Sequence, residues 1–179
     1  MFRLATGLVV IISSLTVPFS AWAQKRDIRG VALGMTVAEA ITALGGKCRQ
    51  EAPSFDPNQW TCTSASGSAS GSASGHGMSF RVTKTTAKIF EVTFGFYATN
   101  NRTVVLQDIS STYNLTLSRC GGTSSIRDGV WVRLECSGFQ DPSGSERYIL
   151  LLHDENLLQA DNEAIKIKQQ KNAPPVPKL

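Results

Sequence analysis

The stretch GVALGMTVAEAITALGGKC, residues 30–48, specifies both ends of a helix and then reaches a cysteine. Thr36 is a favourable N-cap and Glu39 stands three residues later, so TVAE is a capping box. Gly45-Gly46 supplies the left-handed conformation in which many helices end. The apolar residues between these signals fall on one helical face: Val37, Ile41 and Leu44. The segment therefore predicts a helix of about ten residues whose apolar face packs on a sheet.

The strands of that sheet are expected to follow directly. Residues 58–63 (NQWTCT) have a short strand pattern, and residues 78–84 and 88–97 alternate apolar and polar side chains with period two. The last two segments are separated by a connection of hairpin length. The alternation in residues 88–97 places three aromatic side chains on one face, where we expect them to join the core: Phe90, Phe94 and Phe96.

A low-complexity segment lies between the first two strand patterns. The tetrad Ser-Ala-Ser-Gly occurs three times between residues 64 and 75. Such small side chains bury too little apolar area to offset the entropy lost when the chain is ordered. We therefore interpret residues 64–77 as a flexible hairpin extension.

The second half of the chain has a similar layout. Residues 102–113 predict an amphipathic helix capped by Asn101, and residues 129–138 and 146–153 predict strands around the turn DPSG. The strand at residues 146–153 ends in a nearly continuous apolar run, so we expect it to lie inside the sheet. Residues 154–171 are compatible with a helix that Asp154 caps, with Glu155 and Asp161 suited to its start and exposed face.

The order of elements predicts an α+β fold. We expect two tandem units of helix and antiparallel strands, residues 24–100 and 101–171. In this prediction the two units form one sheet, the helices pack on one of its faces, and each unit has one disulfide. Residues 172–179 (NAPPVPKL) are rich in proline and lack apolar periodicity, so we expect a disordered tail.

The first residues have the pattern of a secretory signal peptide. Arg3 precedes an apolar run that is shorter than the roughly 20 residues of a membrane-spanning helix, and Ala21-Trp22-Ala23 is a small-x-small cleavage site. We expect cleavage after Ala23 and a periplasmic or secreted protein without an integral membrane segment. The alternative interpretation is a membrane anchor.

The four cysteines all lie in the part expected to be exported, where an even number of cysteines favours disulfides. Three pairings exist in principle. The similar spacings and settings favour Cys48–Cys62 and Cys120–Cys136, each of which closes a loop of about 15 residues and contributes about 3 kcal/mol. A site for a metal ion with four thiolate ligands is the rival interpretation, but the sequence lacks a C-x-x-C pair.

The opening segment also resembles a known pattern, G-x-x-x-G-M-[ST]-x-x-E-[AV]-x-x-x-[IL]-G, found in small exported bacterial proteins. The matching residues are Gly30, Gly34, Met35, Thr36, Glu39, Ala40 and Gly45. Proteins with this opening include the outer-membrane assembly lipoprotein (SmpA/OmlA) group, and two α/β units with a disulfide each resemble the β-lactamase inhibitor protein fold. The resemblance covers about 16 residues and implies helices on an antiparallel sheet and a function in protein binding.

The chain departs from both groups in one respect each. The assembly lipoproteins have an acylated cysteine after the signal, whereas Gln24 stands there in this chain. The contact loops of the inhibitors have no residue-by-residue match. The resemblance therefore implies neither membrane anchoring nor β-lactamase inhibition.

Catalytic motifs are missing from the sequence. His76 and His153 are the two histidines, and neither has the spacing of a metal-ligand pair. We interpret both as solvent-facing or edge residues. The sequence contains no G-x-S-x-G, P-loop or H-E-x-x-H motif, and it leaves no free thiol if both disulfides form. We predict no enzymatic activity, no cofactor and no metal ion.

The charge gives little support for nucleic-acid binding. Without Arg3 the chain has 17 Lys and Arg residues against 14 Asp and Glu residues, and the basic residues are not clustered with aromatic ones. We predict an interaction module that binds another protein of the cell envelope through Trp60, Tyr97 and Trp131, because Trp and Tyr are enriched in binding surfaces. The alternatives are that these residues flank the core, and that the protein is a ligand-binding protein or a hydrolase whose site is assembled from distant residues.

Overall fold

The computed structural model describes residues 27–45, 47–52, 56–63, 77–140 and 143–172. The predicted signal peptide, residues 64–76 of the low-complexity segment and residues 173–179 of the tail lie outside these ranges. Two positions at their margins differ from the prediction: Gly77 begins a strand, and Asn172 is the C-cap of the last helix.

The described residues form three helices and nine strands. The helices are α1 (Val37–Leu44), α2 (Arg102–Tyr113) and α3 (Glu155–Lys171). The strands are β1 (Asp27–Ile28), β2 (Val31–Ala32), β3 (Lys47–Gln50), β4 (Gln59–Thr63), β5 (Gly77–Val82), β6 (Ile89–Ala98), β7 (Thr123–Arg127), β8 (Val130–Gln140) and β9 (Glu146–Asp154).

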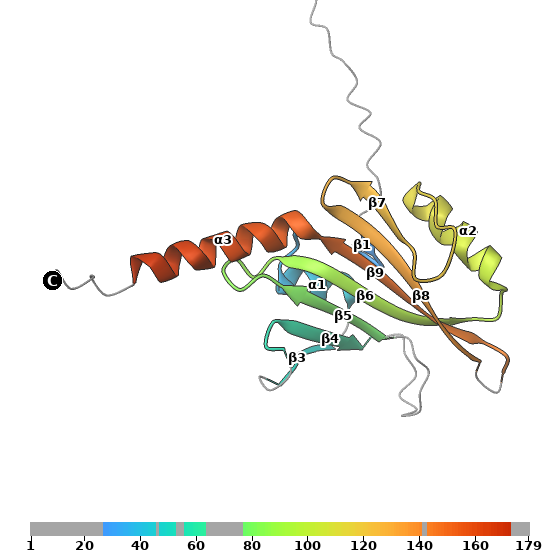
Figure 1. Cartoon of the computed structure of the whole chain (residues 1–179). Coiled ribbons are helices and arrows are strands. Elements are labelled where there is room, and N and C mark those ends of the chain that lie inside the picture. The colour runs from blue at the N-terminus through green and yellow to red at the C-terminus, as the bar shows by residue number, and fades with distance from the viewer. Residues whose placement is uncertain (1–26, 46, 53–55, 64–76, 141–142, 173–179) are drawn as a thin grey trace, which may run out of the picture.

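The predicted α+β class is confirmed. Seven strands form one antiparallel sheet in the order β3-β4-β5-β6-β9-β8-β7, and β1 and β2 form a separate hairpin (Figure 1). Strand β9 lies between β6 and β8, which confirms the interior position expected from its apolar run. Strands β3 and β7 are the two edges of the sheet. These edge strands and the β1–β2 hairpin are not predictable from the sequence, since all are short and lack clear alternation.

The opening segment forms the capped helix that its sequence predicts. The backbone N–H of Thr36 donates to the Glu39 carboxylate at 2.7 Å, and the Glu39 N–H donates to the Thr36 hydroxyl at 3.3 Å. Gly45 ends the helix with φ 57°. Just before the helix, the Gly34 N–H donates to the Ile89 carbonyl at 2.7 Å. This contact joins the entry of α1 to the start of β6, so the segment both begins the helix and places it beside the sheet.

The apolar core lies on one side of the seven-stranded sheet, which we call the core face. Helix α1 contributes Ala40 to this core, and α2 contributes Val105 and Tyr113. Among the described residues, none of the core residues comes from α3, which continues from the end of β9 beyond the sheet (Figure 1). The strand residues of the core face include Phe80, Val92, Phe94, Val132, Leu134, Tyr148, Leu150 and Leu152.

One aromatic residue lies on the opposite side from the one predicted. Val82 pairs with Ile89 whereas Arg81 pairs with Glu91, so Phe90 is an extra residue in the β5–β6 ladder. An irregularity of this kind turns the extra side chain away from the face that simple alternation assigns. The Phe90 ring therefore packs against His153 and Arg81 rather than with Phe94.

The two disulfides are the predicted ones, Cys48–Cys62 and Cys120–Cys136. Cys48 and Cys62 face each other across β3 and β4, with Cα atoms 4.0 Å apart. Cys120 lies in the loop before β7 and is joined to Cys136 of β8. Among the described residues there is no free cysteine.

Candidate functional site

The side of the sheet opposite the core face carries the residues that alternate with the core residues, and we call it the open face. In Figure 1 the strands β5 and β6 lie in front of α1, and Ala40 of this helix belongs to the core, so the helix is on the other side of the sheet. Large side chains of the open face are partly buried by their neighbours in the strands. They are Trp131, Arg133, Ile149, Leu151 and Tyr97, with the buried His153 at one end.

The three aromatic residues predicted to form a binding surface do not share one face. Trp131 and Tyr97 lie on the open face, where they pair with His153 and Arg147 respectively. Trp60 pairs with Phe80 on the core face and stacks on its ring, with the ring centroids 6.5 Å apart. The structure therefore separates Trp60 from the other two residues and supports the alternative interpretation that it flanks the core.

His153 was predicted to be a solvent-facing or edge residue, but it is buried in the interior strand β9, and its side chain is 8% exposed. Its Nδ1 lies 3.1 Å from the Glu91 carboxylate of β6, and its Nε2 lies 3.1 Å from the Glu155 carboxylate of α3. The imidazole stacks on the Trp131 indole at a centroid distance of 4.6 Å. The cluster thus joins β6, β8, β9 and the first turn of α3.

The two carboxylates set the charge of this histidine. Burial lowers the pKa of His153, but the hydrogen bonds and negative charges of Glu91 and Glu155 outweigh this effect and raise the pKa above its usual value of 6.5. Only the protonated ring can donate to both carboxylates at once. Because both nitrogens have carboxylate partners and the ring is buried, this arrangement offers no free nitrogen to a substrate.

A hollow lies on the open face where β5 pairs with β6, at the N-terminal end of β5. Gly77 of β5 pairs directly with Gly95 of β6, and Gly95 pairs with Ile149 of β9. Two neighbouring residues without side chains leave a gap of about 200 Å³ in the layer of side chains. Its walls include Thr61, Ser79, Thr93, Arg147 and Ile149. Glycine within a strand marks a place where another group can approach the backbone closely. Of the two glycines, only Gly95 lies within a segment that the sequence predicts as a strand.

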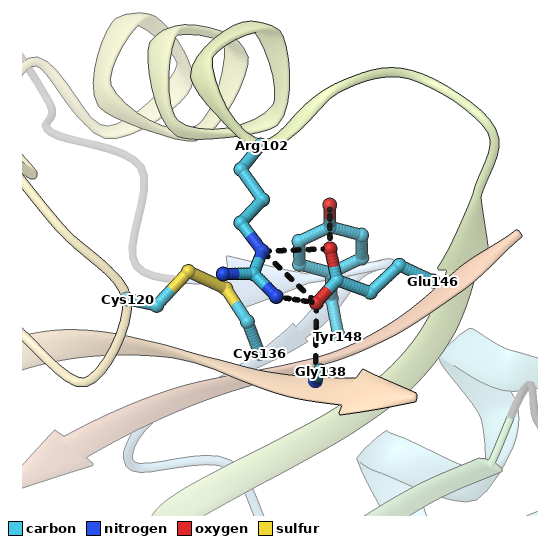
Figure 2. The surroundings of a disulfide bond; sticks show 6 residues. All are labelled: Arg102, Cys120, Cys136, Gly138, Glu146 and Tyr148. Carbon is cyan, nitrogen blue, oxygen red and sulfur yellow. Dashed lines mark hydrogen bonds and ion pairs between the residues drawn. A yellow bond between two sulfur atoms is a disulfide. The ribbon is translucent and has the colours of Figure 1, made fainter. Parts of the chain in front are cut away.

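A second polar cluster lies beside the Cys120–Cys136 disulfide (Figure 2). Glu146, whose side chain is 8% exposed, accepts from the Arg102 guanidinium, with the shortest distance 2.8 Å from Nη2. The Tyr148 hydroxyl donates to the same carboxylate at 2.9 Å, and the Gly138 N–H donates at 3.1 Å. The hydrogen bond from Arg102 is the largest cause of the lowered pKa of Glu146.

The Glu146 cluster has a structural role. It joins the first residue of α2 to the β8–β9 hairpin, and every donor in it belongs to the chain itself. Because the carboxylate accepts several hydrogen bonds, these bonds offset the free-energy cost of burying its charge. The cluster therefore explains how α2 is held at this end of the sheet without pointing to a ligand.

A third buried carboxylate connects α3 to the sheet. The sequence predicts Asp161 on the exposed face of the helix, but the residue is buried and only 5% exposed. It accepts from the backbone N–H groups of Lys84 and Thr85 at 2.7 and 2.8 Å. Asp161 thus binds the donors of the β5–β6 turn, an unpredictable contact because the partners lie more than 70 residues away in the chain.

The described residues give no indication of a metal centre or a membrane span. Among them, no group of three or more His, Cys, Asp or Glu side chains is arranged to hold a metal ion. No helix in this part of the chain is both long and apolar enough to cross a membrane. The candidate site is the open face, because it combines partly exposed aromatic residues with a hollow.

Comparisons with known proteins identify no relative. No protein-family model, curated protein or solved structure matches the chain. The resemblance of residues 30–45 to exported assembly lipoproteins stays a prediction, and the function is argued from the geometry.

Proposed function

We propose that this chain is an exported protein–protein interaction module that binds a partner in the cell envelope through the open face of its sheet. In this proposal the signal peptide is cleaved after Ala23, and the mature protein acts in the periplasm or outside the cell. The two disulfides are compatible with an oxidising compartment. The resemblance to protein-binding families points in the same direction.

The observation that carries the proposal is the distribution of apolar side chains over the two sides of the sheet. The core face packs against α1, α2 and the β1–β2 hairpin. The open face also carries Trp131, Ile149 and Leu151, which lie on adjacent strands and remain partly exposed. Partly exposed apolar side chains on a rigid surface are typical of binding sites, and tryptophan is among the residues that contribute most to binding.

We further propose that the molecule consists of two tandem units with helices packed on one face of the sheet. In the first unit α1 precedes the strands β3 to β6, and in the second α2 precedes β7 to β9. Each unit contains one disulfide: Cys48–Cys62 joins β3 to β4, and Cys120–Cys136 joins the loop before β7 to β8. In this proposal the units meet at the β6–β9 pairing, so the centre of the open face lies at their junction.

The alternative function is a small-ligand-binding protein or a hydrolase. Among the described residues, His153 has the surroundings most similar to those of a catalytic base, since a carboxylate orients its ring. However, the second carboxylate occupies the nitrogen that would accept a proton from a nucleophile. The geometry therefore favours the interaction module.

The test is a cross-linking pull-down from the envelope fraction of the protein's own organism. The full chain, with disulfides intact and a C-terminal tag, is compared with the Trp131→Ser and Leu151→Ser variants. We expect one specific partner with the wild type and its loss with both variants, because each removes apolar area from the open face. Val104→Ser is the matched control, since Val104 is an exposed apolar residue of α2, 37% exposed.

Two outcomes would contradict the proposal. The first is a partner that both open-face variants retain at wild-type yield, which would place the binding surface elsewhere. The second is the absence of any partner above background, which would favour the small-ligand alternative. Thermal melting of each variant separates loss of binding from loss of folding.

A further inference from the structure

The hollow on the open face suggests what kind of group the partner presents. This inference rests on the proposed binding function of that face. Gly77 and Gly95 form its floor, Ile149 forms an apolar wall, and the hydroxyls of Ser79 and Thr93 line another side. The volume of about 200 Å³ is suited to one side chain rather than to a large ligand.

The backbone gives no reason for glycine at position 77. Gly77 does not have the positive φ angle of the turn glycines, and a Cβ atom built on it meets nothing within 4 Å. Glycine inside a strand weakens the strand, because it has no side chain to pack. An alanine would fit at lower conformational cost, so the effect of the glycine is to keep the hollow open.

The charge at the hollow comes from Arg147. Two other arginines of the open face have carboxylate partners: Arg81 contacts Asp56 at 3.0 Å, and Arg133 contacts Glu135 at 3.0 Å. Arg147 is exposed, and among the described residues its guanidinium makes no hydrogen bond or ion pair. The acidic groups near the hollow have other partners: Glu135, which pairs with Ile149 across β8 and β9, contacts Arg133. The Glu51 carboxylate accepts from Thr61 on the opposite wall.

We propose that the hollow binds one acidic side chain, glutamate or aspartate, of the partner protein. Its methylene groups contact Ile149 and the glycine floor, and its carboxylate contacts the Arg147 guanidinium. Hydroxyl groups of Ser79 and Thr93 are available as further donors. A charge-assisted contact of this kind gives register and specificity to a face that otherwise offers apolar area.

The experiment uses a random library of 12-residue displayed peptides, selected on the immobilised full chain with intact disulfides. We expect the selected peptides to have an acidic residue at one shared position. Arg147→Gln should weaken binding of a synthetic selected peptide about tenfold or more, because it removes a charge-assisted contact. Gly77→Val should weaken binding by filling the hollow, and Gly77→Ala should do so less.

The matched controls separate this inference from the proposed function. Arg119→Gln removes another exposed arginine, which lies outside the open face and should leave binding unchanged. Replacing the shared acidic residue of the peptide by its amide should weaken binding to the wild type as much as Arg147→Gln does. The same replacement should cause no further loss of affinity for the Arg147→Gln variant.

Selected peptides without an acidic residue, peptides insensitive to Arg147→Gln, or no enrichment over a selection without the protein would each overturn this inference. Loss of binding with Trp131→Ser but not with Arg147→Gln would retain the open face as the binding surface and reject the acidic occupant. Peptides whose binding is unaffected by both Trp131→Ser and Arg147→Gln would contradict the proposed function as well.

Discussion

Strand β9 buries a charged cluster at each end, and the two ends use different chemistry. At its start, Glu146 accepts from Arg102, a group that stays charged at all ordinary pH values, and from neutral donors. At its end, His153 contacts Glu91 and Glu155, and its own charge depends on pH. The same strand thus has one polar connection that changes its charge only in acid, through Glu146, and one whose charge depends on His153. The comparison shows that the partners of a buried charge decide the pH range in which its connection is lost.

The largest effect is expected for Glu146→Ala. The change leaves the buried Tyr148 hydroxyl and the Gly138 N–H without their acceptor and should lower the free energy of unfolding by about 3 kcal/mol. Chemical denaturation checks this value. Glu135→Ala is the control, since its pair with Arg133 lies on the surface with both side chains 43% exposed, and should cost less than about 0.5 kcal/mol. Equal effects of the two changes would show that the Glu146 cluster is no more important than a surface ion pair.

Removal of the neighbouring disulfide is expected to have the next largest effect. The double variant Cys120→Ala/Cys136→Ala should lower the free energy of unfolding by about 2 to 3 kcal/mol, since it reopens a loop with a sequence separation of 16. Hydrogen exchange should show the loss first in the β8–β9 hairpin, near Glu146. The Cys48→Ala/Cys62→Ala variant is the matched control, with a separation of 14. It should leave exchange near Glu146 unchanged.

A smaller effect, visible only as a function of pH, is expected from His153. Its pKa in the folded protein is raised above 6.5, so its contribution to stability is complete below pH 6.5 and is lost as the pH rises through the folded pKa. The loss should be about 1 kcal/mol, which is the size of one hydrogen bond. His153→Gln should remove this dependence, as measured by denaturation between pH 5 and about 9. If the free energy of unfolding of this variant changed with pH as it does in the wild type, the contacts of His153 with Glu91 and Glu155 would not be the cause of the pH dependence.

The Glu146 end should show the opposite direction. The pKa of Glu146 is lowered from 4.5 in the folded protein, so its contribution is present above pH 4.5 and is lost as the pH falls through the folded pKa. The wild type should therefore be most stable between about pH 4.5 and 6.5. In a plot of the free energy of unfolding against pH, Glu146→Gln should remove only the decrease below pH 4.5. His153→Gln should remove only the decrease above pH 6.5.

The smallest effect is expected at the hollow. Gly77→Ala should leave the melting temperature unchanged or raise it slightly, because the added Cβ meets no neighbour and the unfolded chain loses freedom. A clear decrease would show that the glycine is required for folding. The same variant then could not report on binding.

Local signals explain why much of the fold was predictable. The ends of α1 depend on Thr36, Glu39 and Gly45, which lie within one short segment, so the sequence predicts this helix well. The caps of α2 and α3, Asn101 and Asp154, were also predicted correctly. These features need no information from distant parts of the chain.

Features that depend on pairing between distant strands were not predictable. The extra residue at Phe90 follows from the register of β5 with β6, and alternation along β6 alone assigns the wrong face. His153 meets Glu91 only because β9 pairs with β6, although the two residues are 62 positions apart. The hollow was not predictable either, because only Gly95 lies within a predicted strand and Gly77 falls in the segment interpreted as flexible. Its form depends on the pairing of Gly77 with Gly95.

The strand order also bears on how the protein reaches its native state. Consecutive strands pair with each other everywhere in the seven-stranded sheet except at β6 and β9. Pairings between consecutive strands close short loops and form early, whereas the β6–β9 pairing must close a long one and is expected to form late. Neither disulfide crosses that junction. Both native disulfides can therefore form before the two parts of the sheet meet, so a fully oxidised chain is not evidence that folding is complete.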